Sequence, residues 1–265
     1  MFKLRDLVQP VTLEQAFELL TSKKSNTVLG GCAFLKLGGK RITTAIDISK
    51  LGLDFINDQP ELIEIGAMAT LRDLEISRVL MEYFNGVIPQ AVGNVVGVQF
   101  RNTVTAGGSV FSKYGFSDLL TALLALDTEV ELYKGGHMSL TGFLDRPYEK
   151  DILTKIMIKK NARQAAYQSL RNSAADYPVL NVAVSCLDGH WLIAVGARPL
   201  KAKLARQAAG ILTGNELSRE NIELAARTAA RELSFGTNAR GTAEYRRALC
   251  EVLVKRAVAE VGKQC

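Results

Sequence analysis

The second half of the sequence places two strands before three helices. Apolar runs at 182–187 and 191–195 flank Asp188-Gly189, a dipeptide typical of the two-residue turn of a β-hairpin. Helical runs follow near 199–212, 218–233 and 242–261. Strands followed by helices, rather than alternating with them, are typical of an α+β fold. This order therefore predicts an α+β architecture for this half of the chain.

The first half mixes short strands and helices, and the pattern changes near residue 160. Thr70, with Asp73 three residues later, predicts the start of a helix that runs to Leu80. Strands are expected at 27–29, 42–48, 61–67 and 128–133, helices at 86–100 and 118–126, and a loop at 100–117. We therefore divide the chain into residues 1–160, with a subdivision near 55, and residues 161–265.

The composition excludes several classes of protein. No stretch approaches the roughly 20 apolar residues that span a bilayer, and the first residues lack the features of a signal peptide. We expect a soluble, cytoplasmic protein without a membrane partner. The basic residues behind the net charge of +6 are spread out and no RNA-binding aromatic motif occurs, so no nucleic-acid partner is expected. The four cysteines lie far apart and only two histidines are present, so no metal site is expected either.

The first glycine pair follows a short apolar strand. Glycine lets backbone N–H groups approach a ligand and adopts positive φ, and successive N–H groups that point one way form an anion-binding concavity. A diphosphate would fit such a turn, although a tight turn between packed elements is the more common reason for an isolated Gly-Gly pair. The spacing matches neither the Rossmann fingerprint nor the P-loop. The segment consists of Val28, Leu29, Gly30, Gly31, Cys32, Ala33 and Phe34.

The second glycine pair lies among hydroxyl side chains. Thr105, Gly107, Gly108 and Ser109 are followed within a few residues by Ser112, Ser117 and Asp118. Hydroxyl and amide groups suit phosphate oxygens, and a carboxylate can accept hydrogen bonds from ribose or ribityl hydroxyls. The alternative interpretation of Asp118 is a helix N-cap. Both roles are compatible, because a carboxylate has two oxygens.

In this order along the chain, these segments resemble the flavoprotein subunits of molybdenum hydroxylases, a family that includes xanthine dehydrogenase and carbon monoxide dehydrogenase. The resemblance covers nearly the whole chain. Its motifs are Arg101-Asn102-x-x-Thr105-x-Gly107-Gly108-Ser109, Ser117-Asp118-Leu119, Ala122-Leu123-Leu124-Ala125-Leu126-Asp127, Ile65-Gly66-Ala67, Asp151-Ile152-Leu153-Thr154 and Arg240-Gly241-Thr242-Ala243-Glu244-Tyr245-Arg246-Arg247.

The resemblance implies a fold and a set of FAD-binding residues. The fold would be a two-part FAD-binding domain followed by a C-terminal domain with a small antiparallel sheet and three helices. Backbone amides of the 28–34 segment would bind the FAD diphosphate, and Thr105, Gly107, Gly108, Ser109 and Ser112 would form a second wall. Ser117 and Asp118 would hold the adenosine or ribityl portion. Val96, Ile152 and Leu153 would contact the flavin. Four positions depart from the family pattern: Cys32, Ala33, Val104 and Gln168.

The resemblance also implies an electron-transfer role without a substrate-oxidising site or a catalytic residue in this chain. Electrons would pass from the clusters of an iron–sulfur subunit through FAD to a final acceptor such as NAD, while a molybdenum-cofactor subunit oxidises the substrate. The four departures leave open an alternative, a flavin-free docking subunit of the same assembly. A stand-alone flavin oxidoreductase is a third interpretation. His137 and His190 give it little support, because both are expected to be exposed turn residues.

Overall fold

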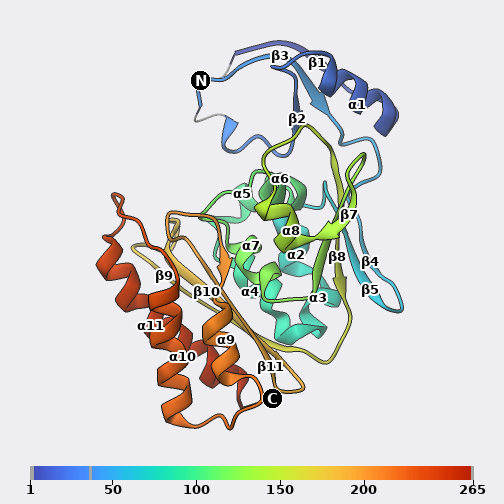
Figure 1. Cartoon of the computed structure of the whole chain (residues 1–265). Helices are drawn as coiled ribbons and strands as arrows, with labels where there is room; N and C mark the ends of the chain where they lie inside the picture. Colours follow the sequence, from blue (N-terminus) through green and yellow to red (C-terminus); the bar gives the residue numbers. More distant parts are fainter. Residues whose placement is uncertain (1–2, 36–37, 264–265) are drawn as a thin grey trace. The chain divides into compact units, whose positions relative to one another are not determined.

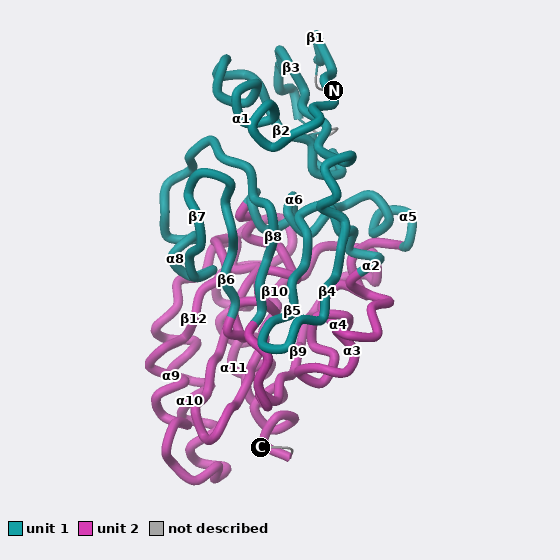
Figure 2. The backbone as a smooth tube through the Cα atoms, turned by 90° about the vertical axis from the view of Figure 1, so that its right-hand side faces the viewer, with its two compact units in different colours: residues 1–73, 98–112, 128–158 teal, residues 74–97, 113–127, 159–265 magenta. Residues whose placement is uncertain are grey.

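The computed structural model describes residues 3–35 and 38–263 of the chain (Figure 1). The chain forms two compact units, each built from segments that are not contiguous in sequence (Figure 2). Unit 1 comprises Met1–Asp73, Val98–Ser112 and Thr128–Ile158, and unit 2 comprises Leu74–Gly97, Lys113–Asp127 and Lys159–Cys265. The domain boundaries near 55 and 160 stay predictions.

Unit 1 begins with a three-stranded parallel sheet in the order β1-β3-β2. Helix α1 packs on β3, and its buried Ala16 and Leu20 meet Ile46 in one apolar cluster. The hydroxyl of Thr12 caps α1 by accepting a hydrogen bond from the amide of Gln15. The bounds are β1 Lys3–Val8, α1 Leu13–Ser22, β2 Thr27–Leu29 and β3 Arg41–Asp47.

A five-stranded sheet in the order β4-β5-β8-β6-β7 forms the rest of unit 1, together with short helices. The clean alternation of burial along Thr128–Leu132 confirms the predicted half-buried strand. The strands are β4 Ile56–Asp58, β5 Leu62–Gly66, β6 Thr128–Leu132, β7 Gly136–Ser139 and β8 Leu153–Lys159, and the helices are α5 Val98–Arg101, α6 Ala106–Phe111 and α8 Leu140–Asp145.

Unit 2 is built around a four-stranded antiparallel sheet in the order β12-β11-β10-β9. Residues of β10 alternate between the two faces. Val182 and Val184 join the apolar cluster with the three C-terminal helices, whereas Asn181 and Ser185 bond to the segment around α7, so both faces are covered. The strands are β9 Gln164–Arg171, β10 Pro178–Leu187, β11 His190–Gly196 and β12 Lys203–Leu204.

The helices of unit 2 include the three predicted for the C-terminal part, which pack beside one another (Figure 1). This arrangement confirms the predicted α+β class. The bounds are α3 Arg78–Glu82, a 3-10 helix η2 Phe84–Gly86, α4 Val87–Gly93, α7 Asp118–Leu124, α9 Arg206–Leu212, α10 Arg219–Glu232 and α11 Ala243–Val261; α2 Leu71–Ile76 begins in unit 1 and ends in unit 2. Within the described ranges, no helix is both long and apolar enough to cross a bilayer.

Several sequence-based boundaries were wrong. The helix expected from Thr70 to Leu80 begins as predicted, with Thr70 and Asp73 bonding to each other's amides, but it is interrupted because the Ser77 hydroxyl caps a new helix at the amide of Leu80. The segment expected at 86–100 is divided into two helices, and Val96 between them has a left-handed φ of 52°. The segment expected to be loop at 100–117 contains α6.

Candidate functional site

The first glycine pair lies directly after β2, in unit 1. Gly31 and Cys32 both adopt left-handed φ, 77° and 59°. No hydrogen bond joins the amides of Gly30, Gly31 and Ala33 to another residue in the described part of the chain. Residues 30–34 are all half-buried, so this segment packs against the protein but does not lie in the core. Such an arrangement of unpaired amides suits an anionic oxygen.

The second glycine pair is not in a turn but in the first turn of α6. Thr105 caps this helix, and its Oγ1 accepts a hydrogen bond from the Gly108 amide at 3.1 Å. The amides of Ala106 and Gly107 donate to the carbonyls of Ala69 and Ala67, each at 2.8 Å. The amide of Ser109 donates to the Thr105 carbonyl. The expectation of bare amides here was therefore wrong, because Ala67 and Ala69 from a distant segment of the same unit, together with the N-cap Thr105, already accept these hydrogen bonds.

The two glycine pairs touch each other. A Cβ atom on Gly30 would lie 2.9 Å from the Gly108 Cα atom, and one on Gly108 would lie 2.6 Å from the Gly30 carbonyl oxygen. A Cβ atom on Gly31 would lie 1.9 Å from the carbonyl oxygen of Thr103. The glycines thus bring two backbone segments into contact with no gap between them for a ligand. An anion would therefore have to bind on the side of the 30–34 segment that faces away from α6.

The hydroxyl groups near α6 differ in availability. The hydroxyl of Ser109 donates to the Thr105 carbonyl at 2.9 Å, so its proton is already engaged. Ser112 follows the end of α6, is exposed, and its hydroxyl bonds to no described residue. Phe34 packs edge-on against Phe100, with ring centroids 6.3 Å apart, and so joins the first turn to the segment before α6.

The residues predicted to contact a flavin ring lie in different surroundings. The Ile152 side chain is 2% exposed and packs in the apolar cluster with α1. Its amide bonds to Asp151 Oδ1, and its carbonyl accepts the Tyr133 amide. Leu153 is also buried, whereas Val96, in unit 2, is 38% exposed. A β-branched residue in the left-handed region is strained, and such strain often marks a functional segment. Flavin contacts at all three residues stay predictions.

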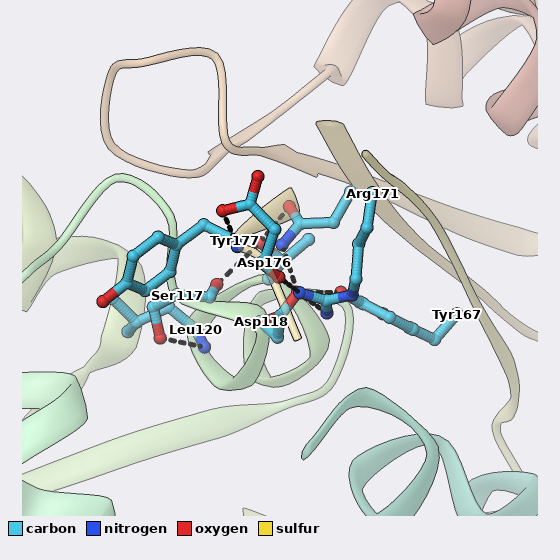
Figure 3. A network of polar contacts seen from close by, with 9 residues as sticks. Ser117, Asp118, Leu120, Tyr167, Arg171, Asp176 and Tyr177 are labelled. Carbon is cyan, nitrogen blue, oxygen red and sulfur yellow. Dashed lines mark hydrogen bonds and ion pairs between the residues drawn. The ribbon is translucent and has the colours of Figure 1, made fainter. Parts of the chain in front are cut away.

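Ser117 and Asp118 belong to unit 2. Figure 3 shows both residues within a network of polar contacts. The hydroxyl of Ser117 caps α7 by accepting the Leu120 amide at 3.2 Å. Asp118 is therefore the first residue of the helix and not its N-cap. Its side chain is 4% exposed. The Oδ1 atom accepts hydrogen bonds from the Tyr167 hydroxyl and from Asn181 Nδ2, and it lies 2.9 Å from Arg171 Nη2.

Sequence reasoning missed the three residues around Asp118. Burial, and then the Asp118 charge and hydrogen bond, raise the pKa of Tyr167 well above its ordinary value, so its hydroxyl remains a donor. The Arg171 contact is electrostatic: Nη2 is close to Oδ1, yet its N–H groups are not aligned for a hydrogen bond. Tyr167, Arg171 and Asn181 lie on strands about 50 to 60 residues from Asp118 in sequence, and no local pattern signals their convergence.

Among residues 3–35 and 38–263, the structure has no group of three or more His, Cys, Asp and Glu side chains that could hold a metal ion. Unit 1 offers amide donors at the first turn, which suit an anionic oxygen, and unit 2 offers the buried Asp118 carboxylate, which can accept a hydrogen bond from a hydroxyl group.

Comparisons with known proteins identify the family of the chain. Residues 2–174 match the family described as the FAD binding domain in molybdopterin dehydrogenase, and residues 165–261 match the CO dehydrogenase flavoprotein C-terminal domain. The chain is 28% identical to the nicotine 6-hydroxylase medium subunit of Paenarthrobacter nicotinovorans, over 96% of this chain and 95% of that one.

Two solved structures share the fold. The first is carbon monoxide dehydrogenase from Hydrogenophaga pseudoflava lacking the Mo-pyranopterin moiety, with a TM-score of 0.90 and 23% identity over 100% of this chain and 98% of that one. The second, reconstituted CO dehydrogenase from Oligotropha carboxidovorans, also has a TM-score of 0.90, with 22% identity over 100% and 99% of the two chains. Because the FAD-binding match alone covers well over half of the sequence, the chain belongs to the FAD-binding flavoproteins of the molybdopterin dehydrogenases, a family of oxidoreductases.

Proposed function

We propose that this chain is the FAD-binding electron-transfer subunit of a xanthine dehydrogenase-type molybdenum hydroxylase. One partner subunit would carry iron–sulfur clusters and deliver electrons, and another would carry the molybdenum cofactor and oxidise the substrate. The similarity to a protein named as the medium subunit of a hydroxylase supports a role within such an assembly. The observation that carries the proposal is the set of unpaired amides at Gly30, Gly31 and Ala33.

Each part of the chain would bind a different part of FAD. The 28–34 segment would donate amide hydrogen bonds to the diphosphate, and the charge on the phosphates would strengthen them. Because these donors are backbone groups, the replacement of polar residues by Cys32 and Ala33 leaves them in place. Thr105, Gly107, Gly108 and Ser109 would support that segment, with Ser112 offering a free hydroxyl. Ser117 and Asp118 would hold sugar hydroxyls, and Val96, Ile152 and Leu153 would contact the ring.

Bound FAD would accept single electrons and pass on two electrons together to the final acceptor. The chain's own residues would bind and orient it. We propose a soluble final acceptor such as NAD and a cytoplasmic location. Reduction of NAD by the assembled complex, compared with reduction of an artificial dye, would test the acceptor.

The diphosphate assignment predicts different effects of two substitutions at Cys32, whose left-handed φ of 59° both asparagine and aspartate tolerate. Cys32→Asp places a carboxylate beside the proposed phosphates and should weaken FAD binding at least about tenfold relative to Cys32→Asn, because like charges at short range repel strongly in a half-buried setting. Raising the ionic strength should reduce this penalty. Cys32→Asn has the same shape without the charge and should bind FAD like the wild type. Titration of the apo-protein with FAD, followed by flavin fluorescence, measures both.

Three outcomes separate the proposals. Equal FAD affinity in both Cys32 variants contradicts the placement of the diphosphate. A wild-type chain that co-purifies with iron–sulfur and molybdenum subunits, yet stays colourless with added FAD, supports the flavin-free docking role instead. Substrate turnover by the isolated chain supports a stand-alone oxidoreductase.

A further inference from the structure

The two oxygens of the Asp118 carboxylate differ in their partners. The Tyr167 hydroxyl donates to Oδ1, and Arg171 Nη2 lies 2.9 Å from it (Figure 3). Asn181 Nδ2 donates to the same atom at 3.0 Å. Within the described residues, no hydrogen bond reaches Oδ2. Three contacts on one oxygen fix the rotation of the carboxylate plane as well as the position of the side chain. The remaining oxygen is thus an oriented acceptor.

Arg171 is itself held by the loop that follows β9. Its Nη1 donates to the Asp176 carbonyl at 2.9 Å, while its buried Nε has no partner. Asp176 Oδ1 accepts a hydrogen bond from Arg240 Nε at 2.9 Å, and Arg240 Nη2 lies 2.8 Å from the same oxygen in an ion pair. The Arg240 guanidinium also lies over the Tyr177 ring, 4.9 Å from its centroid. Arg240, just before the last helix, therefore fixes the loop after β9 through two contacts with Asp176.

Arg240 lies in a loop that is fixed by a buried arginine. Arg246 is 1% exposed and donates to the carbonyls of Gly236 and Gly241, at 2.7 and 2.5 Å, and to Asn238 Oδ1 at 2.7 Å. Its Nε donates to the Val179 carbonyl in β10 at 2.9 Å. A planar guanidinium can serve four acceptors in different directions, which a lysine ammonium cannot do as well. The loop that presents Arg240 is thus tied to the sheet.

We infer that Tyr167, Arg171 and Asn181 are positioning residues that present Asp118 Oδ2 to a ribose or ribityl hydroxyl of the dinucleotide, and that Arg240 supports them from the C-terminal segment. This inference rests on the proposed function, since it takes FAD as the ligand. It assigns a task to the C-terminal signature around 240–247, namely to fix a cofactor contact through Asp176 and Arg171. A pre-fixed acceptor avoids the ordering cost that a mobile carboxylate would add on binding.

Two conservative variants test the inference. Tyr167→Phe removes one hydrogen bond to Oδ1 without changing the ring, and Arg240→Gln removes the ion pair with Asp176. Each should weaken FAD binding by about tenfold, the size expected for one hydrogen bond to a charged group. Matched controls are Tyr83→Phe and Arg219→Gln, which alter residues of the same unit outside this network and should leave the affinity unchanged. Thermal melting of each apo-protein reports folding.

Deoxy analogues of FAD separate positioning from a general structural role. One analogue lacks a ribityl hydroxyl and another lacks a ribose hydroxyl. If Asp118 Oδ2 accepts one of these hydroxyls, the penalty of Tyr167→Phe disappears with the analogue that lacks it and persists with the other analogue. This pattern also identifies which hydroxyl is bound.

Other results overturn the inference. An equal penalty with FAD and with both analogues shows that the network acts only through stability. Wild-type affinity in both variants contradicts the positioning role while leaving the proposed function intact. If wild-type protein fails to bind FAD in the same titration, the proposed function fails first.

Discussion

Gly107 has no room for a side chain, because a Cβ atom there would lie 2.6 Å from the Ala67 Cβ and 2.7 Å from the Ala67 carbonyl oxygen. The same carbonyl accepts the Gly107 amide, so α6 cannot move away without losing a hydrogen bond. Gly107→Ala should therefore lower the free energy of unfolding by about 1–3 kcal/mol, as overpacking of a tight contact does. Urea denaturation of the apo-protein measures this change.

Gly210→Ala provides the control for that prediction. Gly210 lies in α9, and a Cβ atom there would meet nothing within 4 Å. Alanine should stabilise this helix by up to about 1 kcal/mol relative to glycine. If both variants change stability equally, the steric explanation at Gly107 is wrong.

At the residue scale, sequence reasoning selected candidate segments but did not predict all of their hydrogen bonds. It selected both glycine pairs and Asp118, because glycine and acidic residues are visible in the sequence. It expected bare amides at both pairs, yet the Ala106 and Gly107 amides bond to residues 69 and 67. Those partners lie almost 40 residues away, so no local pattern reveals them. Tyr167, Arg171 and Asn181 were missed for the same reason.

Elements defined by local interactions were predicted well. The Asp188-Gly189 turn is an example: both residues are left-handed, with φ of 49° and 74°, and they connect β10 to β11. By contrast, the helix expected over 70–80 was interrupted at Ser77, whose capping hydroxyl competes with continued helix. Strand β8 was missed, because its place between β5 and β6 depends on pairing with distant segments.

A substitution at Gly189, in the hairpin turn, should change stability only through the backbone conformation. A Cβ atom on Gly189 would meet nothing within 4 Å, so Gly189→Ala adds no clash. Its cost should come only from left-handed φ and amount to about 1 kcal/mol. The denaturation midpoint should fall for Gly189→Ala and should not fall for Gly210→Ala. A Cβ atom meets nothing within 4 Å at either position, but Gly210 has helical backbone. A Gly189 variant as stable as the wild type would mean that the turn relaxes to another conformation.

At the scale of the whole molecule, sequence reasoning did not predict that each unit combines segments that are far apart in the sequence. Each unit takes three segments of the chain, and unit 2 recovers residues 74–97 and 113–127 from within the first half. A division of the sequence at one point cannot express that arrangement. The α+β class was still predicted correctly, because it depends on the order of elements and not on which segments assemble together.

Stability in acid is also a property of the whole chain, and two carboxylates in different units should contribute to it. Burial raises the pKa of Glu131, but hydrogen bonding from Thr154 and the charge of Lys155 outweigh it, so the pKa lies below its ordinary 4.5. The hydrogen bond from Arg240 lowers the pKa of Asp176 below 3.8, despite some opposing desolvation. A lowered folded-state pKa gives stability that is complete above the unfolded value and is lost as pH falls through the folded value.

The expected result is a widening loss of stability below about pH 4.5, added to the repulsion that grows as the net charge rises above +6. Glu131→Gln should be less stable than the wild type at pH 7, and this difference should shrink as pH falls, because the wild-type carboxylate becomes protonated and loses its advantage. Glu216→Gln, at an exposed residue, is the control and should keep a constant difference. Urea midpoints between pH 3 and pH 7 measure both. A Glu131→Gln difference independent of pH would show that its contacts with Thr154 and Lys155 do not favour the charged form.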